Sequence, residues 1–200
     1  MHLISSPLSP FVRKVRVALI ETGLAGQVEE VRLATTPLDT DPQAAAANPL
    51  GKIPALIRDD GAALYDSRVI TRYLDDLAGG GLYPQARLWE VLTLEATAEG
   101  IMDAAVLMTY EGRFRPEDLQ YAPWVEAQWA KTARALGAVE ARWMSHLAGP
   151  FDMSHIAMGC ALGYLDFRHD ARAWRQGHPA LAAWYATFAA RDSMVATAPA

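Results

Sequence analysis

The hydrophobic positions in the first part of the chain follow strand-like and helix-like periods in turn. A short strand is predicted at Leu3 and Ile4, and a helix follows it. The hydrophobic face of that helix recurs at helical spacing and comprises Phe11, Val15, Ala18 and Leu19. Ser9 suits the N-cap, Pro10 the first helical position and Gly23 the C-terminal end. Both ends of this helix are therefore encoded locally.

The pattern then continues as strand, loop, hairpin and helix. A second strand is predicted around residues 31–33, and a polar connection rich in Ala and Pro runs from there to Asn48. The hydrophobic segments 55–57 and 63–65 flank an Asp-Gly pair, which is a strong hairpin signal. The helix that follows Ser67 presents hydrophobic residues at helical spacing, Ile70, Tyr73, Leu74 and Leu77. This order predicts a small α/β domain.

The strand-like pattern ends at three consecutive glycines, and it does not return after Tyr83 and Pro84. Glycine-rich segments of this kind commonly separate domains. We therefore expect a first domain of residues 1–78, a linker of residues 79–86 and a second domain of residues 87–200.

The second domain is predicted to be all-helical. One helix begins near Leu88 and carries a hydrophobic face made of Leu94, Ala98, Ile101, Met102 and Ala105; a later helix carries Leu136, Val139, Trp143 and Leu147. The segment 156–164 is hydrophobic almost all round, which is typical of the central helix of a bundle. Asp152 can cap this helix, and Phe151 can pack on Ile156 as a hydrophobic staple. The predicted fold class is α/β plus all-α.

Composition and charge narrow the possible functions. The chain has 200 residues, of which 52% are hydrophobic and 20% charged, enough for a substantial core. A net charge of -5 and the lack of a Lys/Arg-rich block argue against nucleic-acid binding. The start of the chain has no signal-peptide pattern, and no hydrophobic run approaches the ~18 residues of a membrane span. We expect a soluble, cytoplasmic protein without a membrane partner.

Candidate chemistry centres on Ile53 and Pro54. An X-Pro bond adopts the cis form at a cost of only ~0.5 to 1 kcal/mol, and proline cannot donate to a sheet. A bent main chain here would leave the amide and carbonyl of Ile53 free to pair with an extended peptide. The helix start at Ser67 offers backbone amides to a carboxylate. The two features together suit a small peptidic acid.

Four separated motifs carry a family resemblance. They are Ser9-Pro10-Phe11-Val12-Arg13-Lys14, Asn48-Pro49-Leu50-Gly51-Lys52-Ile53-Pro54, Asp66-Ser67-Arg68 and Ala161-Leu162-Gly163-Tyr164-Leu165-Asp166-Phe167-Arg168. In this order, over essentially the whole chain, they resemble the cytosolic glutathione transferase superfamily, in a bacterial, serine-type form. The resemblance implies an N-terminal thioredoxin-like domain followed by a C-terminal helical bundle domain that lines a hydrophobic substrate pocket.

The resemblance implies that glutathione is a co-substrate and that the first domain binds it. Ile53 would pair with its cysteine backbone beside a cis-proline at Pro54. Ser67 would hold the γ-glutamyl carboxylate, Asp66 would lie near the ammonium group, and Lys52 would approach the glycyl carboxylate. The alternatives at these positions are a simple helix cap for Ser67, a solvated turn residue for Asp66 and a surface charge for Lys52.

Catalysis in this family requires the glutathione thiolate, because a thiol with a pKa of about 8.5 is a poor nucleophile at neutral pH. The positive end of the first helix and a hydrogen bond from the Ser9 hydroxyl would stabilise the anion. Ser9 matches the catalytic position of serine-type members, although it can also act only as a cap. Ser5 and Ser6 are weaker candidates. Some relatives carry cysteine at this position and this chain does not, since its single cysteine, Cys160, is expected in the core.

The pocket for an electrophile would draw on Met102, Val106 and Tyr110, which recur on one helical face, and on Phe11. Each of these four can instead be an ordinary core residue. Asp103 lies on the same helix, where acids of some relatives reach the glutathione of a partner subunit. The family also implies a homodimer, which no residue of the sequence demonstrates.

The remaining polar residues suggest no further site. The five histidines form no metal-ligand pattern with carboxylates, so no metal is expected, and Asp166 with His169 is interpreted as a surface pair. The basic run from Arg13 to Arg16 is interpreted as a solvated face. His155 departs from the family, whose second-domain capping box usually ends in aspartate, at an expected cost of about 0.5 to 1 kcal/mol that Asp152 offsets.

The leading hypothesis is a glutathione transferase enzyme with a role in detoxification, which stabilises the glutathione thiolate for attack on a small hydrophobic electrophile. One alternative is a non-enzymatic transferase-like binding or regulatory protein, because a fold can outlive its site. Another is a specialised glutathione-dependent isomerase, dehalogenase or peroxidase. The retained Ser9, Pro54, Asp66 and Ser67 argue against a decayed site.

Overall fold

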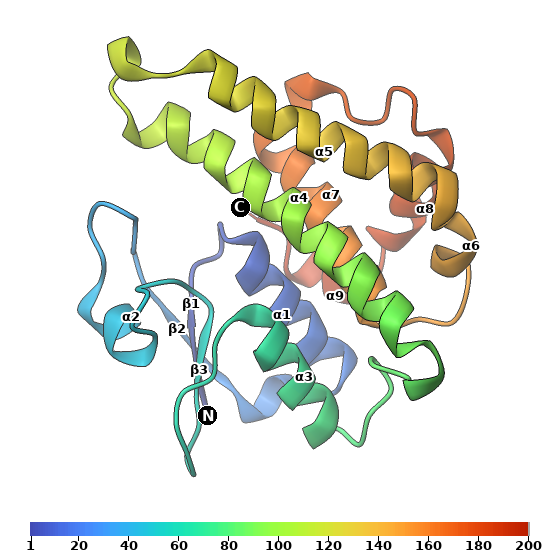
Figure 1. The fold of residues 1–200 in the computed structure, drawn as a ribbon. Helices are drawn as coiled ribbons and strands as arrows, with labels where there is room; N and C mark the ends of the chain where they lie inside the picture. Colours follow the sequence, from blue (N-terminus) through green and yellow to red (C-terminus); the bar gives the residue numbers. More distant parts are fainter. Residues whose placement is uncertain (200) are drawn as a thin grey trace. The chain divides into compact units, whose positions relative to one another are not determined.

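A computed structural model describes residues 1–199, and it divides the chain into two compact units (Figure 1). One unit comprises Met1–Ala86 together with the C-terminal segment that begins at Asp192; the other comprises Arg87–Arg191. The predicted second domain extended to residue 200, whereas the segment from Asp192 groups with the first unit. The α/β plus all-α fold class is confirmed.

The first unit contains a three-stranded sheet in the order β2-β1-β3. β1 (His2–Ser5) is parallel to β2 (Glu29–Arg32) and antiparallel to β3 (Ala55–Ile57). The predicted hairpin forms, since the amides and carbonyls of Leu56 and Leu64 exchange hydrogen bonds of 2.9 and 2.8 Å. Its second arm is only a one-residue bridge rather than the predicted strand.

Four α-helices complete this unit. They are α1 (Pro10–Glu21), α2 (Pro42–Ala47), α3 (Ser67–Leu77) and α9 (Asp192–Ala196), with a 3-10 turn at Ala25–Gln27. A second 3-10 turn, Gln85–Arg87, leads into the second unit. α2 lies in the predicted loop, so that expectation was wrong. The sequence nevertheless encodes it, because the Asp41 carboxylate accepts the Gln43 amide at 2.7 Å and Pro42 occupies the first turn.

Alternate residues of β1 and β3 face opposite sides of the sheet, and each side has its own core. Leu3 and Leu56 pack with hydrophobic residues of α1 and α3, which lie on one side of the strands (Figure 1). Ile4 and Ala55 pack with residues of α2 on the other side. The central strand, β1, is therefore covered on both faces. This packing also holds β3, and with it the Ile53 loop that leads into β3.

The predicted linker is packed against α3. The Asp75 carboxylate accepts the amides of Leu82 and Tyr83 at 2.7 and 3.2 Å, and the Tyr83 hydroxyl lies 2.8 Å from the Thr71 hydroxyl. Leu82 and Tyr83 are each only 6% exposed. The segment after the glycines thus belongs structurally to the first unit.

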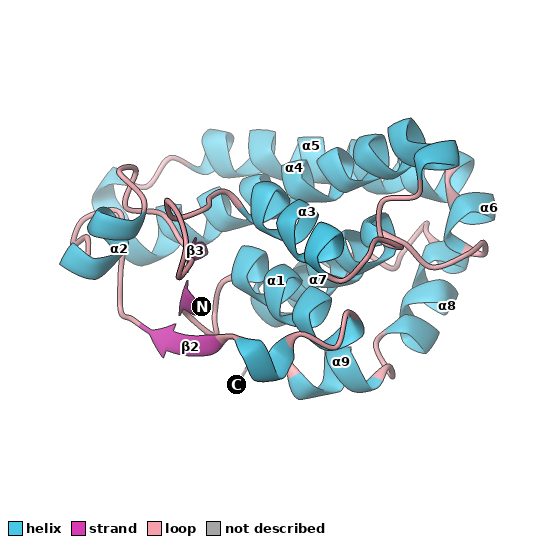
Figure 2. Ribbon diagram, turned by 90° about the horizontal axis from the view of Figure 1, so that it is seen from below, coloured by secondary structure: helices cyan, strands magenta, loops and turns pink. Residues whose placement is uncertain are grey.

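The second unit is helical throughout its described residues. Its helices are α4 (Leu88–Phe114), α5 (Ala122–Arg142), α6 (Met144–Leu147), α7 (Met153–His169) and α8 (Pro179–Phe188), with 3-10 turns at Glu117–Leu119 and Asp170–Arg172. α7 is buried continuously from Met153 to Leu165, as its hydrophobic sequence predicts, and Cys160 lies in this core. The colours of Figure 2 show that the strands (magenta) are short compared with most of the helices (cyan).

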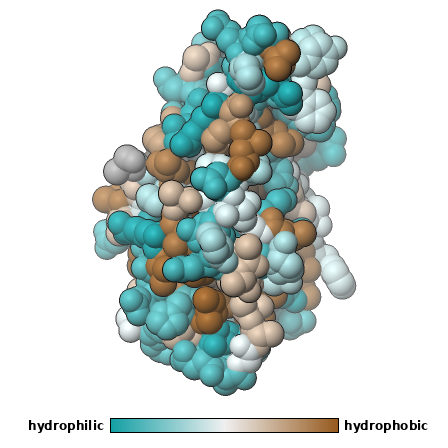
Figure 3. Space-filling view, turned by 90° about the vertical axis from the view of Figure 1, so that its left-hand side faces the viewer, coloured by the Kyte–Doolittle hydropathy of each residue, from teal (hydrophilic) through white to brown (hydrophobic). Residues whose placement is uncertain are grey.

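The surface mixes hydrophobic and hydrophilic residues. On the face drawn in Figure 3, hydrophobic residues lie between hydrophilic ones in small separate groups. Among residues 1–199, no helix has the length and hydrophobicity needed to cross a bilayer.

Candidate functional site

Ser9 lies at the N-terminus of α1 with extended backbone angles, and its Oγ accepts the Val12 amide at 3.3 Å. The hydroxyl accepts this bond through a lone pair, so its hydrogen can still be donated to a ligand. The side chain is half-buried, and the aligned amides of α1 add positive potential here. Ser5 is less suitable, because it is buried and donates to Glu30 Oε1 at 2.8 Å.

The Ile53 edge is held by a residue that sequence reasoning missed. The buried side chain of Asn48 donates to the Lys52 carbonyl at 2.9 Å and accepts the Leu50 amide at 3.0 Å. The Ile53–Pro54 peptide bond is cis, as expected. Within residues 1–199, neither main-chain polar group of Ile53 has a hydrogen-bond partner. A rigid loop thus presents a free amide and a free carbonyl.

Gly51 is required for the shape of this loop. Its φ is +64°, in the left-handed region, and a Cβ would lie 2.5 Å from Cγ2 of Thr40. Because the Thr40 side chain occupies the space, a larger residue at this position would move the main chain that leads to Ile53. Lys52 itself is exposed, and its ammonium group has no ion-pair partner in the described part of the chain.

Asp66 and Ser67 form the start of α3, with Asp66 at the N-cap and Ser67 at the first helical position. Asp66 Oδ1 accepts the Arg68 amide at 3.0 Å, and its Oδ2 pairs with the Arg68 guanidinium at 2.9 Å. Burial alone would raise the pKa of Asp66, but the hydrogen bonds and charge of Arg68, helped by Lys14, lower it overall. Asp66 is therefore an ionised cap rather than a freely solvated turn residue, and Ser67 is buried.

The basic run on α1 is not a solvated face, so that interpretation was wrong. Lys14 has no exposed surface and Arg13 is 7% exposed. The Arg13 guanidinium donates to the Met194 carbonyl at 2.9 Å, which fastens α9 to α1. Arg16 pairs with Glu30 at 3.4 Å. Periodicity could not reveal these roles, because the partners are distant in sequence.

The residues predicted for the electrophile pocket differ in burial. Met102 is fully buried, which favours a core role, whereas Phe11, Val106 and Tyr110 are half-buried. Asp103 is exposed on α4. Val106 and Tyr110 lie one helical turn apart, so they share a face of the second unit.

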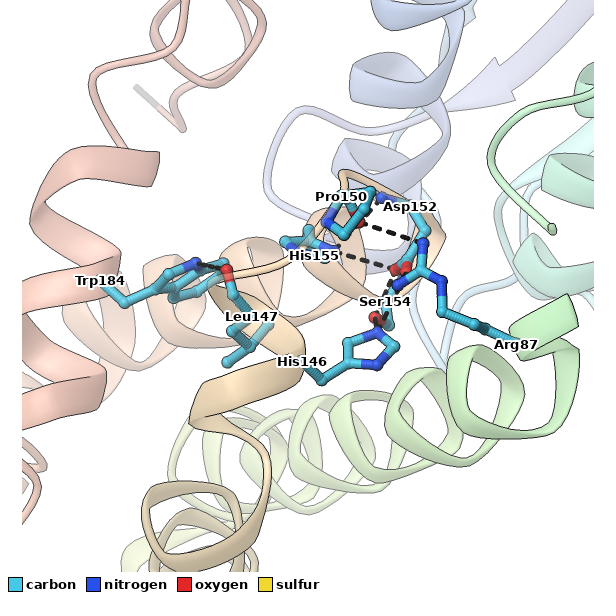
Figure 4. A network of polar contacts seen from close by, with 8 residues as sticks. All are labelled: Arg87, His146, Leu147, Pro150, Asp152, Ser154, His155 and Trp184. Atoms are coloured by element: carbon cyan, nitrogen blue, oxygen red, sulfur yellow. Dashed lines mark hydrogen bonds and ion pairs between the residues drawn. The ribbon is translucent and has the colours of Figure 1, made fainter.

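A buried polar cluster marks the start of α7 (Figure 4). The Asp152 carboxylate, fully buried, accepts the Ser154 amide at 3.0 Å, and the His155 ring lies 2.9 Å from it through Nδ1. The other carboxylate oxygen lies 3.2 Å from Arg87 Nη1 and 3.0 Å from His146 Nε2. The sequence spacing showed no metal-ligand pattern among the histidines, yet the fold brings His146, Asp152 and His155 together. His155 Nδ1 also lies 3.3 Å from the Asp152 amide nitrogen, which places His155 at the second position of the capping box.

The electrostatics of this cluster favour a helix cap over a metal centre. Ligand atoms of His146, Asp152 and His155 lie within 4.8 Å of one another, close enough to be considered for a cation. Arg87 already pairs with the carboxylate, and its positive charge would repel a metal ion. Burial would raise the pKa of Asp152, but hydrogen bonds from His155 and Ser154 lower it overall. Burial lowers the pKa of His146, which keeps that ring neutral.

The predicted pair of Asp166 with His169 does not form. Asp166 instead accepts the Trp174 indole N–H at 2.7 Å and pairs with Arg175, while His169 Nε2 lies 2.9 Å from the Ala105 carbonyl. Both residues therefore bind other elements of the helical unit and not each other.

Comparison with protein families gives two matches to this chain. Residues 8–77 match the family described as glutathione S-transferase, N-terminal domain. Residues 122–187 match the family described as glutathione S-transferase, C-terminal domain. The first match includes the starts of α1 and α3 and the Ile53 loop.

Individual relatives cover the whole chain. The GST-like protein YibF of Escherichia coli is 31% identical over 100% of this chain and 98% of its own length. A glutathione transferase family member from Pseudomonas fluorescens, solved with bound glutathione, is 47% identical with a TM-score of 0.97, covering 100% of this chain and 98% of that one. A structure from the same species with bound S-(propanoic acid)-glutathione is 46% identical with a TM-score of 0.92, covering 100% of both chains.

Proposed function

Because the chain belongs to the glutathione S-transferase family, we propose that it binds glutathione and transfers it to a small electrophile. The observation that carries this proposal is the unpaired main chain of Ile53, on a rigid loop in the same unit as two capped helix starts. The glutathione bound to the Pseudomonas fluorescens relative supports it.

In the proposed complex the tripeptide adds to the Ile53 edge. Its cysteine amide and carbonyl would pair with the two free groups of Ile53, next to Pro54. The γ-glutamyl carboxylate would accept amides at the start of α3, at Ser67, and its ammonium group would lie near the ionised Asp66. The exposed Lys52 would reach the glycyl carboxylate. Each group of the tripeptide would thus meet a protein group of complementary charge or hydrogen-bonding type.

The chemical step would begin when the glutathione thiol loses its proton to solvent. The Ser9 hydroxyl would donate a hydrogen bond to the sulfur, and the α1 N-terminus would stabilise the negative charge. Each unit by which the thiol pKa falls corresponds to about 1.4 kcal/mol. The thiolate would then form a carbon–sulfur bond with the electrophile, and a leaving group would depart with its electron pair.

The test combines retention on immobilised glutathione with conjugation of 1-chloro-2,4-dinitrobenzene. We expect retention, and we expect Ser9→Ala to lower kcat/KM about 10- to 100-fold and to shift the pH–rate profile to higher pH. Ser6→Ala is the matched control, because it removes a neighbouring hydroxyl from the same loop. A wild-type protein that is not retained on immobilised glutathione would contradict the proposal. An unchanged pH–rate profile in Ser9→Ala would contradict the role of Ser9.

Two alternative functions remain distinct outcomes of this test. Retention without conjugation would favour a specialised glutathione-dependent isomerase, dehalogenase or peroxidase. No retention would favour a non-enzymatic binding or regulatory protein. A role in detoxification, a cytoplasmic location and a homodimer are part of the proposal, and light scattering at several concentrations tests the dimer.

A further inference from the structure

A chain of hydrogen bonds joins α4 to α7 in the second unit. The Tyr164 hydroxyl donates to Thr109 Oγ1 at 3.3 Å, and Thr109 donates in turn to the Ala105 carbonyl at 3.0 Å. His169 Nε2 lies 3.1 Å from the same Thr109 oxygen. These bonds hold the side chain of Tyr164, which is 6% exposed, against Thr109, the residue that precedes Tyr110 on α4.

Two arginines lie one helical turn beyond these residues, Arg113 after Tyr110 on α4 and Arg168 after Tyr164 on α7. The Arg168 guanidinium stacks 4.0 Å from the centre of the Phe167 ring, and it also bonds to Tyr164, which counters the rise that burial causes in the pKa of that phenol. The Arg113 guanidinium lies 5.2 Å from the centre of the Phe114 ring. Both arginines are exposed, and in the part of the chain that the structure describes neither pairs with a carboxylate.

Tyr110 follows Thr109, the residue that binds Tyr164. Its ring packs edge-on against the Phe114 ring at 5.1 Å between ring centres, and the Arg113 guanidinium lies over that same Phe114 ring. Burial raises the pKa of Tyr110, so the phenol is a neutral hydrogen-bond donor at pH 7. Within residues 1–199 its hydroxyl has no hydrogen-bond partner, although the side chain is half-buried.

The acids two residues before each arginine, Glu111 and Asp166, bind other groups. Glu111 pairs with Arg115 at 2.8 Å and accepts the Tyr121 amide. Asp166 pairs with Arg175 at 2.6 Å. Burial also lowers the pKa of His169, which leaves that ring uncharged. Within residues 1–199, Arg113 and Arg168 thus keep their positive charges without a carboxylate partner, and the Tyr110 hydroxyl is left without a hydrogen-bond partner.

We propose that Tyr110, Arg113 and Arg168 form a carboxylate-binding corner that selects electrophiles carrying an acid group. The inference rests on the proposed function, and it replaces the expected purely hydrophobic substrate with one that is hydrophobic at one end and anionic at the other. A carboxylate accepts several hydrogen bonds at once, and a guanidinium fork with a phenol hydroxyl supplies them. The aromatic rings of Phe114 and Phe167 hold the guanidinium groups in place.

The test compares two aryl chlorides that are each activated by two nitro groups, the neutral 1-chloro-2,4-dinitrobenzene and the anionic 4-chloro-3,5-dinitrobenzoate. The measured quantity is the ratio of kcat/KM for the benzoate to kcat/KM for the neutral substrate. When this ratio is compared between protein variants, the difference in intrinsic reactivity of the two substrates cancels. We expect Arg168→Gln to lower this ratio about 10-fold, and Arg113→Gln and Tyr110→Phe to lower it 3- to 10-fold. Arg168→Lys should recover part of the loss, since it keeps the charge.

Arg134→Gln is the matched control, because Arg134 is also an exposed arginine but belongs to α5 rather than to α4 or α7. We expect its ratio to equal that of the wild type. A ratio that Arg168→Gln and Arg113→Gln leave unchanged, or that Arg134→Gln lowers equally, would overturn the proposal. Raising the salt concentration should lower the wild-type ratio, because exposed charges are screened.

The corner can fail independently of the proposed function. If the protein neither binds glutathione nor turns over either electrophile, the proposed function fails, and the corner is then tested by calorimetric titration with 4-chloro-3,5-dinitrobenzoate alone. Binding that Arg168→Gln weakens about 10-fold would support the corner. Binding that is absent from the wild type, or equal in the variant, would overturn it.

Discussion

The sharpest stability test of this structure is Asp152→Ala at the start of α7. The Asp152 carboxylate is fully buried, it caps α7 through the Ser154 amide, and it faces Arg87 and two imidazole rings. Replacing it with alanine removes the cap and leaves the guanidinium without its partner. We expect the helical unit to lose a large part of its stability, because α7 forms the core of that unit.

The expected size follows from two contributions. Loss of an N-cap side chain costs about 1 kcal/mol. Removing one partner of a buried ion pair costs about 3 to 5 kcal/mol, but the Arg87 side chain is 30% exposed and can gain water, so we take about 2 kcal/mol here. The sum is about 3 kcal/mol, and at 2 to 4 °C per kcal/mol it corresponds to a fall in Tm of about 6 to 12 °C.

Urea unfolding followed by circular dichroism measures this loss. Asp152→Asn separates the two contributions, since asparagine keeps a good cap but loses the charge, and we expect it to lose about 2 kcal/mol. Asp170→Ala is the control, because Asp170 is exposed and is expected to change stability by less than about 0.5 kcal/mol. A loss below about 1 kcal/mol in Asp152→Ala would refute the reasoning. Equal losses in the alanine and asparagine variants would show that the cap hydrogen bond contributes nothing, and an asparagine variant as stable as the wild type would show that the charge contributes nothing.

Two further predictions concern pH and the Ile53 loop. The folded state lowers the pKa of His146 below 6.5 and that of Asp152 below 3.8, so the unfolded state binds protons more readily. The urea midpoint should therefore fall as the pH drops below 6.5, and it should fall again as the pH passes through the lowered pKa of Asp152. His146→Gln should reduce the first fall. A midpoint that stays constant from pH 7.5 to 5 would contradict this prediction. Gly51→Ala should weaken glutathione affinity at least 10-fold, because it displaces the main chain before Ile53. Gly26→Ala should leave the affinity unchanged, because a Cβ there meets nothing within 4 Å. Calorimetric titration with glutathione measures both affinities, and wild-type binding by both variants would contradict the loop argument.

Features that depend on neighbouring residues could be predicted from the sequence. The Ser9 cap with Pro10 fixed the start of α1, and the hydrophobic segment after Asp152 predicted a buried central helix. The glycines and prolines around the Ile53 loop indicated a rigid, specially shaped main chain. Helical period, capping and turn chemistry act over a few residues, so one sequence is enough to reveal them.

The sequence misled wherever the partner lies far along the chain. Arg13 and Lys14 look like a solvated run, but they are buried, and Arg13 binds α9 about 180 residues later. The polar connection before Asn48 hides α2, whose alanines have too little hydrophobic contrast to show a helical face. His146 and His155 show no ligand pattern in sequence, yet both reach Asp152 in the fold.

The sequence by itself thus determined the family, the order of most elements and the positions where a peptidic thiol would bind. Only the tertiary structure decided which charges are buried, which carboxylate lies against two histidines and an arginine, and which arginines of α4 and α7 stay exposed. The physical reason is that burial and pairing depend on which distant segments pack together, and a side chain's charge, hydrogen bonds and accessibility follow from that packing rather than from its neighbours in sequence.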